Sequence, residues 1–315
     1  MITSRWKISF ILLAGGFFVF VSYFYFATNS IEPGPELEIK ELRHQHFPID
    51  VRCDNDKLYD DFGRIMSNYR QCLIDRLNNT ENIFNMLRIA VSICMQNDLW
   101  QRLDAKKLHN EAETKMAILP SPIESKKECI EVTLGVGNNI LAEEKLRNLL
   151  PHCKFYGADP ILASGKIFEK IGTYYQFAVA VEPGVKKAMV LESGRYHSKD
   201  VTTVNFMEFL KKYAKVDKID YLWMDNEGAE YAIFPKYLID NVEMSICQID
   251  VEMHGPLSKY EMNITSFNQL ILSILTRSPF LPIWSDEDYG HVQSLYINVN
   301  DPGCTQTYFS EKFCK

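Results

Sequence analysis

The segment YLWMDNEGAEY, residues 221–231, places three carboxylates directly behind an apolar run. Asp225 ends the run, and Glu227 and Glu230 follow it, with Gly228 between them. Carboxylates this close to one another are destabilising unless a cation, an array of hydrogen-bond donors or solvent stabilises them. The segment therefore predicts a site where one of these three partners meets the chain.

A second group of chemically capable residues lies in QIDVEMHGP, residues 248–256. If this run is a strand, Asp250, Glu252 and His254 share one face, because successive side chains alternate between the faces of a sheet. Two carboxylates and an imidazole can perform acid/base chemistry or bind a metal, and we favour the acid/base role without a metal. A structural histidine in a turn is the alternative for His254.

Glycines and an acid follow two further apolar runs. In LGVGNNI, residues 134–140, Gly135 and Gly137 allow a tight turn and close approach of a ligand to the backbone. Asp159, in FYGADP, can accept hydrogen bonds from both hydroxyls of a ribose. An ordinary strand-to-helix turn and a helix N-cap are the alternatives for these two features.

Short apolar runs that alternate with amphipathic ones would position these residues. Between about residues 120 and 300, this alternation predicts right-handed βαβ units and a doubly wound, mostly parallel α/β sheet. Ligands of such sheets bind beyond the carboxyl ends of the strands. The runs that we expect to form strands are CIEVTLGV, KFYGAD, FAVAV, KAMVL, IDYLWMD, MSICQIDVEM and VQSLYINV.

With these parts in place, IDYLWMDNEGAEY resembles the D-x-E-G-A-E signature of FkbM-type methyltransferases, a branch of the class I S-adenosylmethionine-dependent fold. The resemblance extends from about Glu131 to Val299 and includes the glycine loop, GADP, AVAVEPG, VTTVNFMEFL and VEMH. It implies a Rossmann-like sheet of seven strands that binds S-adenosylmethionine and presents its methyl group to a hydroxyl acceptor.

The resemblance also implies roles for individual residues. A positively charged sulfonium would explain why acids cluster at this edge. The implied cofactor-binding residues are Gly135, Gly137 and Asn138 at the methionine end, Asp159 at the ribose and Asp225 beside the sulfonium. The implied catalytic residues are Glu252 or His254 as general base, with Asp225 and Glu227.

The chain departs from the family pattern at one position. The family usually has an acid two residues before the first glycine, where this chain has Thr133. Glu131 lies on the same face of the expected strand and is the nearest substitute. This departure keeps open an alternative in which the domain binds partners without catalysing a reaction.

The N-terminus predicts a membrane anchor. Residues 8–27 contain no charged side chain, and at ~1.5 Å per residue a helix of this length spans the ~30 Å hydrocarbon core. Arg5 and Lys7 precede it, so we expect residues 1–7 in the cytoplasm and a single-pass type II membrane protein. A cleaved signal peptide is the alternative.

The part after the anchor has features of a secretory compartment. All eight cysteines follow residue 27, which favours disulfides in an oxidising space, and Asn78 and Asn263 begin glycosylation sequons. We therefore expect this part to face the lumen of the endoplasmic reticulum or Golgi. The net charge of −7 argues against a nucleic-acid partner.

These patterns divide the chain into a stem at 28–55, a helical region at 56–118 and a methyltransferase domain at 119–315. The predicted reaction is O-methylation of a lumenal acceptor, such as a glycan or a lipid-linked sugar. A glycosyltransferase is a further alternative, because type II anchors with stems are common among these enzymes. Its D-x-D motif would be DND, residues 54–56.

Overall fold

The structure is a computed structural model that describes residues 55–110, 113–192, 195–240, 242–256, 262–288 and 290–313. The predicted cytoplasmic tail, the anchor at 8–27 and nearly all of the stem lie outside these residues, as do Cys53, Cys314 and Asp54, the first residue of the DND motif. Among the helices of the described ranges, none combines the length and the hydrophobicity needed to cross a membrane.

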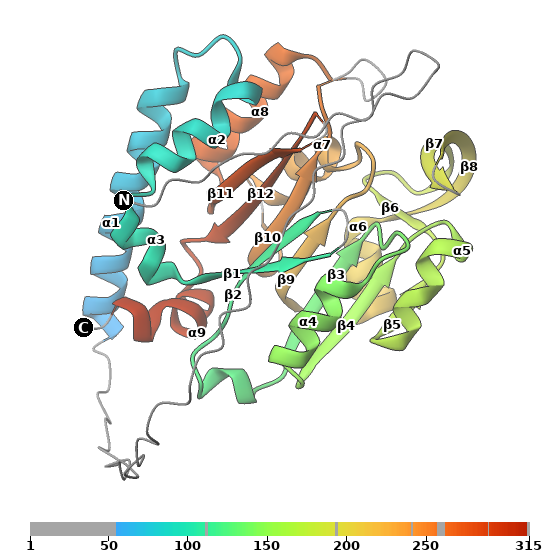
Figure 1. Cartoon of the computed structure of the whole chain (residues 1–315), viewed down its shortest axis with the longest axis horizontal. Coiled ribbons are helices and arrows are strands. Elements are labelled where there is room, and N and C mark those ends of the chain that lie inside the picture. Colours follow the sequence, from blue (N-terminus) through green and yellow to red (C-terminus); the bar gives the residue numbers. More distant parts are fainter. Residues whose placement is uncertain are drawn as a thin grey trace, which may run out of the picture. The chain divides into compact units, whose positions relative to one another are not determined.

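A seven-stranded sheet is the centre of the fold (Figure 1). Its strands in spatial order are β11 (Phe280–Asp288), β12 (His291–Asn298), β10 (Ser245–Met253), β9 (Lys218–Met224), β3 (Cys129–Leu134), β4 (Cys153–Ala158) and β5 (Thr173–Tyr175). Strand β12 runs antiparallel to both neighbours, and the other pairings are parallel. The prediction of a mostly parallel α/β sheet of seven strands is confirmed.

Strand β9 shows why this sequence forms a buried parallel sheet. From Ile219 to Met224 every residue is at most 2% exposed. Such a run, apolar except for Asp220, suits a strand that is covered on both faces. The register pairs Leu134 with Met224 and Met224 with Val251, so β3, β9 and β10 end at the same edge.

Helices follow most of the strands, as the alternating pattern predicts. After β3 comes α4 (Leu141–Leu149), after β4 comes α5 (Leu162–Gly165) with a 3-10 turn (Lys166–Lys170), and after β10 comes α8 (Ile264–Arg277). The helices α6 (Phe206–Glu208) and α7 (Glu230–Ile233) each continue into a π-helical turn, Phe209–Ala214 and Phe234–Leu238. The last helix is α9 (Pro302–Phe313), and a 3-10 turn (Glu124–Lys126) precedes β3.

The region that precedes this domain is helical only in part. Helices α1 (Asn55–Leu77), α2 (Ile83–Cys94) and α3 (Asn97–Leu103) confirm the expected helices, but β1 (Ala105–His109) and β2 (Thr114–Ile118) form an antiparallel pair. The prediction of a helical region up to residue 118 is therefore wrong over residues 105–118. Short runs such as these have too little periodicity to separate a strand from a helix.

The hairpin of β1 and β2 packs across one face of the sheet (Figure 1). The side chain of Gln248 accepts a hydrogen bond from the backbone N–H of Ile118 (2.7 Å) and donates one to its carbonyl (2.9 Å). Asp250 accepts from the N–H of Met116 (2.8 Å), and Tyr221 donates to the carbonyl of Ile118 (3.0 Å). Polar side chains in the middle of the sheet thus satisfy the backbone of β2.

A second sheet of three strands contains β6 (Ala178–Ala180), β8 (Arg195–Asn205) and β7 (Gly184–Glu192), in that order. The runs FAVAV and KAMVL were expected to join the main sheet, and this expectation is wrong. Ile161, Val190 and Val201 form a small apolar cluster of their own, which attaches this sheet to the loop after β4.

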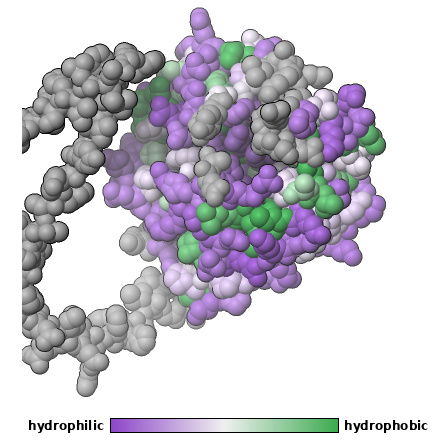
Figure 2. Space-filling view, turned by 45° about the vertical axis from the view of Figure 1, so that its right-hand side comes forward, coloured by the Kyte–Doolittle hydropathy of each residue, from purple (hydrophilic) through white to green (hydrophobic). Residues whose placement is uncertain are grey.

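Three disulfides lie within the described residues. They join Cys72 to Cys94, Cys129 to Cys153 and Cys247 to Cys304. The last of these joins β10 to α9. The face drawn in Figure 2 is mainly hydrophilic, with its hydrophobic residues gathered in patches.

The docking of the hairpin leads to a test on stability. Replacing Gln248 by Met should lower the free energy of unfolding by ~2–3 kcal/mol, because the buried N–H of Ile118 loses its acceptor. Replacing Tyr221 by Phe should cost about 1 kcal/mol or less, because the carbonyl of Ile118 keeps its bond from Gln248. Urea denaturation of both variants measures the difference, and equal losses would contradict this account.

Candidate functional site

The glycine loop after β3 touches the end of β9. Gly135 and Gly137 have φ of 83° and 62°, in the region that favours glycine. A Cβ at Gly135 would collide with the backbone carbonyl of Asp225, whereas a Cβ at Gly137 would meet open space. Asp225 in turn donates its N–H to the carbonyl of Leu134 (2.8 Å). The loops after β3 and β9 therefore form one continuous rim.

Asp159 lies at the end of β4, as expected, and is 7% exposed. One carboxylate oxygen accepts the N–H of Gly137 (3.0 Å), and the other accepts the N–H of Ile161 (2.7 Å). Burial raises the pKa of Asp159, although these N–H groups and that of Val136 act in the opposite direction. Its carboxylate thus holds the glycine loop in position, and each oxygen retains a lone pair for a ligand.

A cavity of about 160 Å³ opens between these loops. Its polar wall comes from the strand ends and includes Asn138, Asp159, Asp225, Asn226 and Glu227. Its apolar wall comes largely from the second sheet and the loop after β4, through Ile161, Ala178, Val179, Ala188 and Val190. The side-chain oxygen of Asn226 is buried and has no hydrogen-bond partner in the described part of the chain, so it is an acceptor available to a ligand.

The acids of the opening segment surround His254. This side chain is 2% exposed, and its Nε2 lies 3.3 Å from Glu227, 3.6 Å from Asp225 and 4.0 Å from Glu252. Its Nδ1 lies 3.0 Å from Glu230, which also accepts the backbone N–H of His254 (3.0 Å). The predicted proximity of Asp225, Glu227, Glu252 and His254 is therefore present in the structure.

The pKa values of this cluster divide its members into a cation and proton acceptors. Burial lowers the pKa of His254, but its bonds to Glu227 and Glu230 and the charge of Asp225 raise it to about 11. Burial raises the pKa of Glu252 to about 7, against the opposing effect of His254. Burial and the charge of Glu252 also raise the pKa of Asp225. His254 is thus an imidazolium at neutral pH, and Glu252 is the member suited to accept a proton.

The sequence matches a known family over residues 94–280, more than half of the chain, and that family is described as the methyltransferase FkbM domain. The chain belongs to the FkbM methyltransferase family. No curated protein sequence matches it. The predicted resemblance is confirmed at this level, and the matched range begins within α2, ahead of the boundary that we predicted at residue 119.

Two solved structures are similar to this member of the FkbM family at low identity. One is TrmK of M. capricolum in complex with S-adenosyl-homocysteine, at 12% identity and a TM-score of 0.32, with 55% of this chain and 63% of that chain covered. This chain thus covers less than two thirds of TrmK. The other is the plantazolicin methyltransferase BpumL in complex with S-adenosyl-homocysteine, at 12% identity and a TM-score of 0.29. This match covers 78% of this chain and 95% of that chain.

At the position where FkbM proteins usually have an acid, this family member has a buried network. Thr133 donates to Glu131 (2.5 Å), and Lys115 on β2 lies 3.2 Å from Glu143 on α4. Glu131 and Glu143 are both 0% exposed, and each has one carboxylate oxygen without a partner among the described residues. Burial and the charge of Glu143 raise the pKa of Glu131. Glu131 thus takes the expected place beside Thr133.

The structure brings two further residues to the site, Glu113 and His291, that the sequence pattern does not single out. Glu113 reaches Gln293 (3.2 Å) from the hairpin, and His291 stacks edge-on against His254 at 4.6 Å. Three sets of side chains place atoms that could ligate a metal ion within 4.8 Å of one another. These sets are Glu252, His254 and His291; Asp225, Glu227 and His254; and Glu113, Asp225 and Glu252. Glu113 lies in the polar run HNEAET, residues 109–114, within the range 56–118 that the sequence predicts as helical.

The two glycines of the loop give a matched pair of variants. Replacing Gly135 by Ala should prevent the β3 and β9 loops from meeting, because its Cβ would collide with backbone that cannot move independently. Replacing Gly137 by Ala should cost only ~1–2 kcal/mol, the price of a left-handed conformation for a residue with a Cβ. Thermal or urea unfolding compares them, and equal stabilities would disprove the contact.

The imidazolium of His254 predicts a dependence of stability on pH. Its pKa is raised on folding, so the stabilisation is complete below its ordinary pKa and is lost as the pH rises towards about 11. The free energy of unfolding should therefore be higher for the wild type than for the His254→Gln variant. This difference should be largest near neutral pH and should shrink as the pH rises.

Urea unfolding at several values between about pH 7 and pH 10 measures this difference. The variant His109→Gln, on an exposed part of β1, is the control for loss of a histidine outside the acid cluster. A difference for His254→Gln that stays constant across the range would show that His254 is neutral in the folded protein.

Proposed function

We propose that this protein is an S-adenosylmethionine-dependent O-methyltransferase whose acceptor is a hydroxyl of a glycan or lipid-linked sugar. The family assignment supports methyl transfer. The observation that carries the cofactor assignment is the cavity, which joins a glycine loop, the carboxylate of Asp159 and the free acceptor oxygen of Asn226. These groups fit a ribose, an adenine with donor N–H groups and a cationic sulfur.

S-adenosylmethionine would supply an electrophilic methyl group on a positively charged sulfur. Asp225 and Glu227 line the polar wall of the cavity, so their charges favour a cation there. Asp159 would accept hydrogen bonds from the ribose while it holds Gly137. The apolar wall, with Ile161, Val179 and Val190, offers a surface for the adenine ring.

In the reaction, the acceptor oxygen forms a bond to the methyl carbon as the bond between carbon and sulfur breaks, and the electron pair stays on sulfur. The hydroxyl proton must leave at the same stage. Glu252 is the residue that we assign as its acceptor, because its pKa of about 7 matches neutral operation. His254 would act as a fixed cation that positions Glu227 and Glu230 and partners Asp225 and Glu252.

The lumenal, membrane-anchored arrangement is part of this proposal. Three disulfides support an oxidising compartment, and the exposed positions of Asn78 and Asn263 are accessible to a glycosylation enzyme. The anchor itself is proposed from residues 8–27 of the sequence.

A non-catalytic binding protein is a second candidate, and one observation favours it. Thr133 replaces the usual acid, and the ammonium of Lys115 is buried beside Glu143, near the strand end where the cofactor's own ammonium would bind. Such a protein would bind S-adenosylmethionine weakly or would bind it without turnover.

Isothermal titration of the full-length protein with S-adenosylmethionine and S-adenosyl-homocysteine tests the proposal. We expect micromolar binding, weakened at least ~10-fold by Asp159→Ala, because hydrogen bonds to a charged acceptor contribute ~1.5–3 kcal/mol. Glu252→Gln should retain binding and lose methyl transfer to oligosaccharide acceptors, and the wild-type rate should rise with pH through about 7.

The controls separate the candidates. Binding without turnover on any hydroxyl acceptor would favour the non-catalytic protein, and absence of binding in a folded, oxidised sample would overturn both. Loss of transfer in the presence of a chelator would assign a metal to the donor groups around Glu252. Full activity of Glu252→Gln would remove this residue as the proton acceptor.

A further inference from the structure

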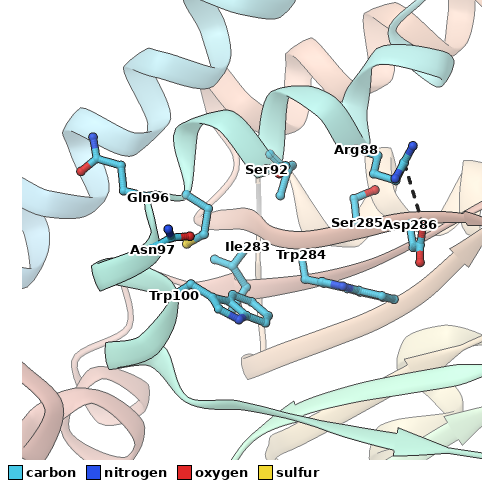
Figure 3. Close-up of a pocket in the computed structure, with 11 residues that line it drawn as sticks. Arg88, Ser92, Gln96, Asn97, Trp100, Ile283, Trp284, Ser285 and Asp286 are labelled. Atoms are coloured by element: carbon cyan, nitrogen blue, oxygen red, sulfur yellow. Dashed lines mark ion pairs between the residues drawn. The ribbon is translucent and has the colours of Figure 1, made fainter. Parts of the chain in front are cut away.

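A second pocket lies away from the cofactor cavity, between α2, α3 and β11 (Figure 3). Its volume is about 300 Å³, at the lower end of the range for small-molecule sites. Two indoles, Trp100 of α3 and Trp284 of β11, lie along one side, and Ser92 of α2 faces them from the other (Figure 3). Both indoles are partly exposed.

Apart from the apolar Val91, Met95 and Ile283, the remaining side chains of this pocket are polar and together carry no net charge. Asn97 and Ser285 contribute an amide and a hydroxyl, and Arg88 lies 3.9 Å from Asp286 at one end of the pocket. The charges of this pair cancel, so the pocket favours neither an anion nor a cation. Neither indole N–H has a hydrogen-bond partner in the described parts of the chain, which leaves two donors for a ligand.

We propose that this pocket binds a neutral saccharide. Sugar rings have an apolar C–H face that packs on an indole, and hydroxyls around the rim that need amide, hydroxyl and charged partners. Two flat apolar surfaces surrounded by neutral or charge-balanced polar groups match this ligand. A purely apolar ligand would leave the amide of Asn97 and the two indole N–H groups unused.

The wall of the pocket is held in a conformation that costs energy. Gln96, between α2 and α3, has φ of 30°, a value that a side chain other than glycine rarely adopts. The disulfide from Cys72 to Cys94 fixes the end of α2 immediately before it. Strained residues of this kind persist where the surroundings enforce them, and they concentrate at binding sites.

The pocket is aligned with the acids of the proposed active site. Asp286 pairs in register with Gln293, and Gln293 pairs with Glu252. Neighbouring strands lie ~4.8 Å apart, so Asp286 and Glu252 are about 10 Å apart across the sheet. One sugar unit packed against the indoles would thus bring a neighbouring unit of the same saccharide towards Glu252. This inference rests on the proposed function in taking the pocket as an acceptor subsite.

Titration of the full-length protein with neutral di- and trisaccharides, such as chitobiose, mannobiose and maltotriose, tests the pocket through tryptophan fluorescence. We expect at least one sugar to shift the emission and to bind ~10-fold more weakly, or not at all, in Trp284→Ala. Because Trp284 also packs on the core, Ser92→Phe provides a second variant, which fills the pocket from the exposed face of α2.

Ile93→Phe is the matched control, because it adds the same ring at the neighbouring residue of α2. The side chain of Ile93 is 50% exposed and does not line the pocket, so this variant should bind sugar as the wild type does. All three variants should bind S-adenosylmethionine unchanged, which separates failure of this inference from failure of the methyltransferase proposal. Absence of any fluorescence shift at saturating sugar, or wild-type binding by Ser92→Phe, would overturn it.

Discussion

Charge balance at the carboxyl edge of the sheet is the constraint on which the site depends. Asp225, Glu227, Glu230 and Glu252 gather around His254, and a second buried cation, Lys115, lies between Glu113 and Glu143. A buried carboxylate without a partner would cost several kcal/mol, so the cations and the raised pKa values of the remaining acids make the arrangement possible. The edge still has more acids than cations, and a positively charged ligand would relieve it further.

This balance involves elements from distant parts of the chain. Lys115 and Glu113 come from the hairpin, Glu143 comes from α4, and His254 comes from the end of β10. Each cation therefore stabilises the packing of an element as well as the charge of the site. The backbone of the same hairpin is hydrogen-bonded to Gln248 and Asp250. One face of β10 therefore holds the hairpin with its early residues and contributes Glu252 to the acid cluster with its later ones.

The sequence was sufficient for features that follow from local pattern. Buried runs ending in acids placed Asp225, Glu252 and His254 at one edge, because parallel strands end together. It was insufficient where contacts are distant: Ile118 meets Gln248, 130 residues away, and no periodicity within 105–118 records that partner. The sequence does not separate the strands of the three-stranded sheet from those of the seven-stranded sheet, because both sets of strands are short apolar runs. His254 was proposed as a base, and only the distances to its four carboxylates show why it is held as a cation.

The position of the hairpin has a consequence for what the folding unit of this protein is. Residues that precede the first strand of the sheet cover its polar middle, so a fragment starting at β3 would expose Gln248, Asp250 and the side chain of Tyr221 to solvent. Helices α1 to α3 precede the hairpin in the chain, and α2 packs directly on β11. The amino-terminal helices are thus part of the folded domain rather than a spacer. A protease that cleaved between α3 and β3 would disconnect Glu113 and Lys115 from the chain that carries the other acids.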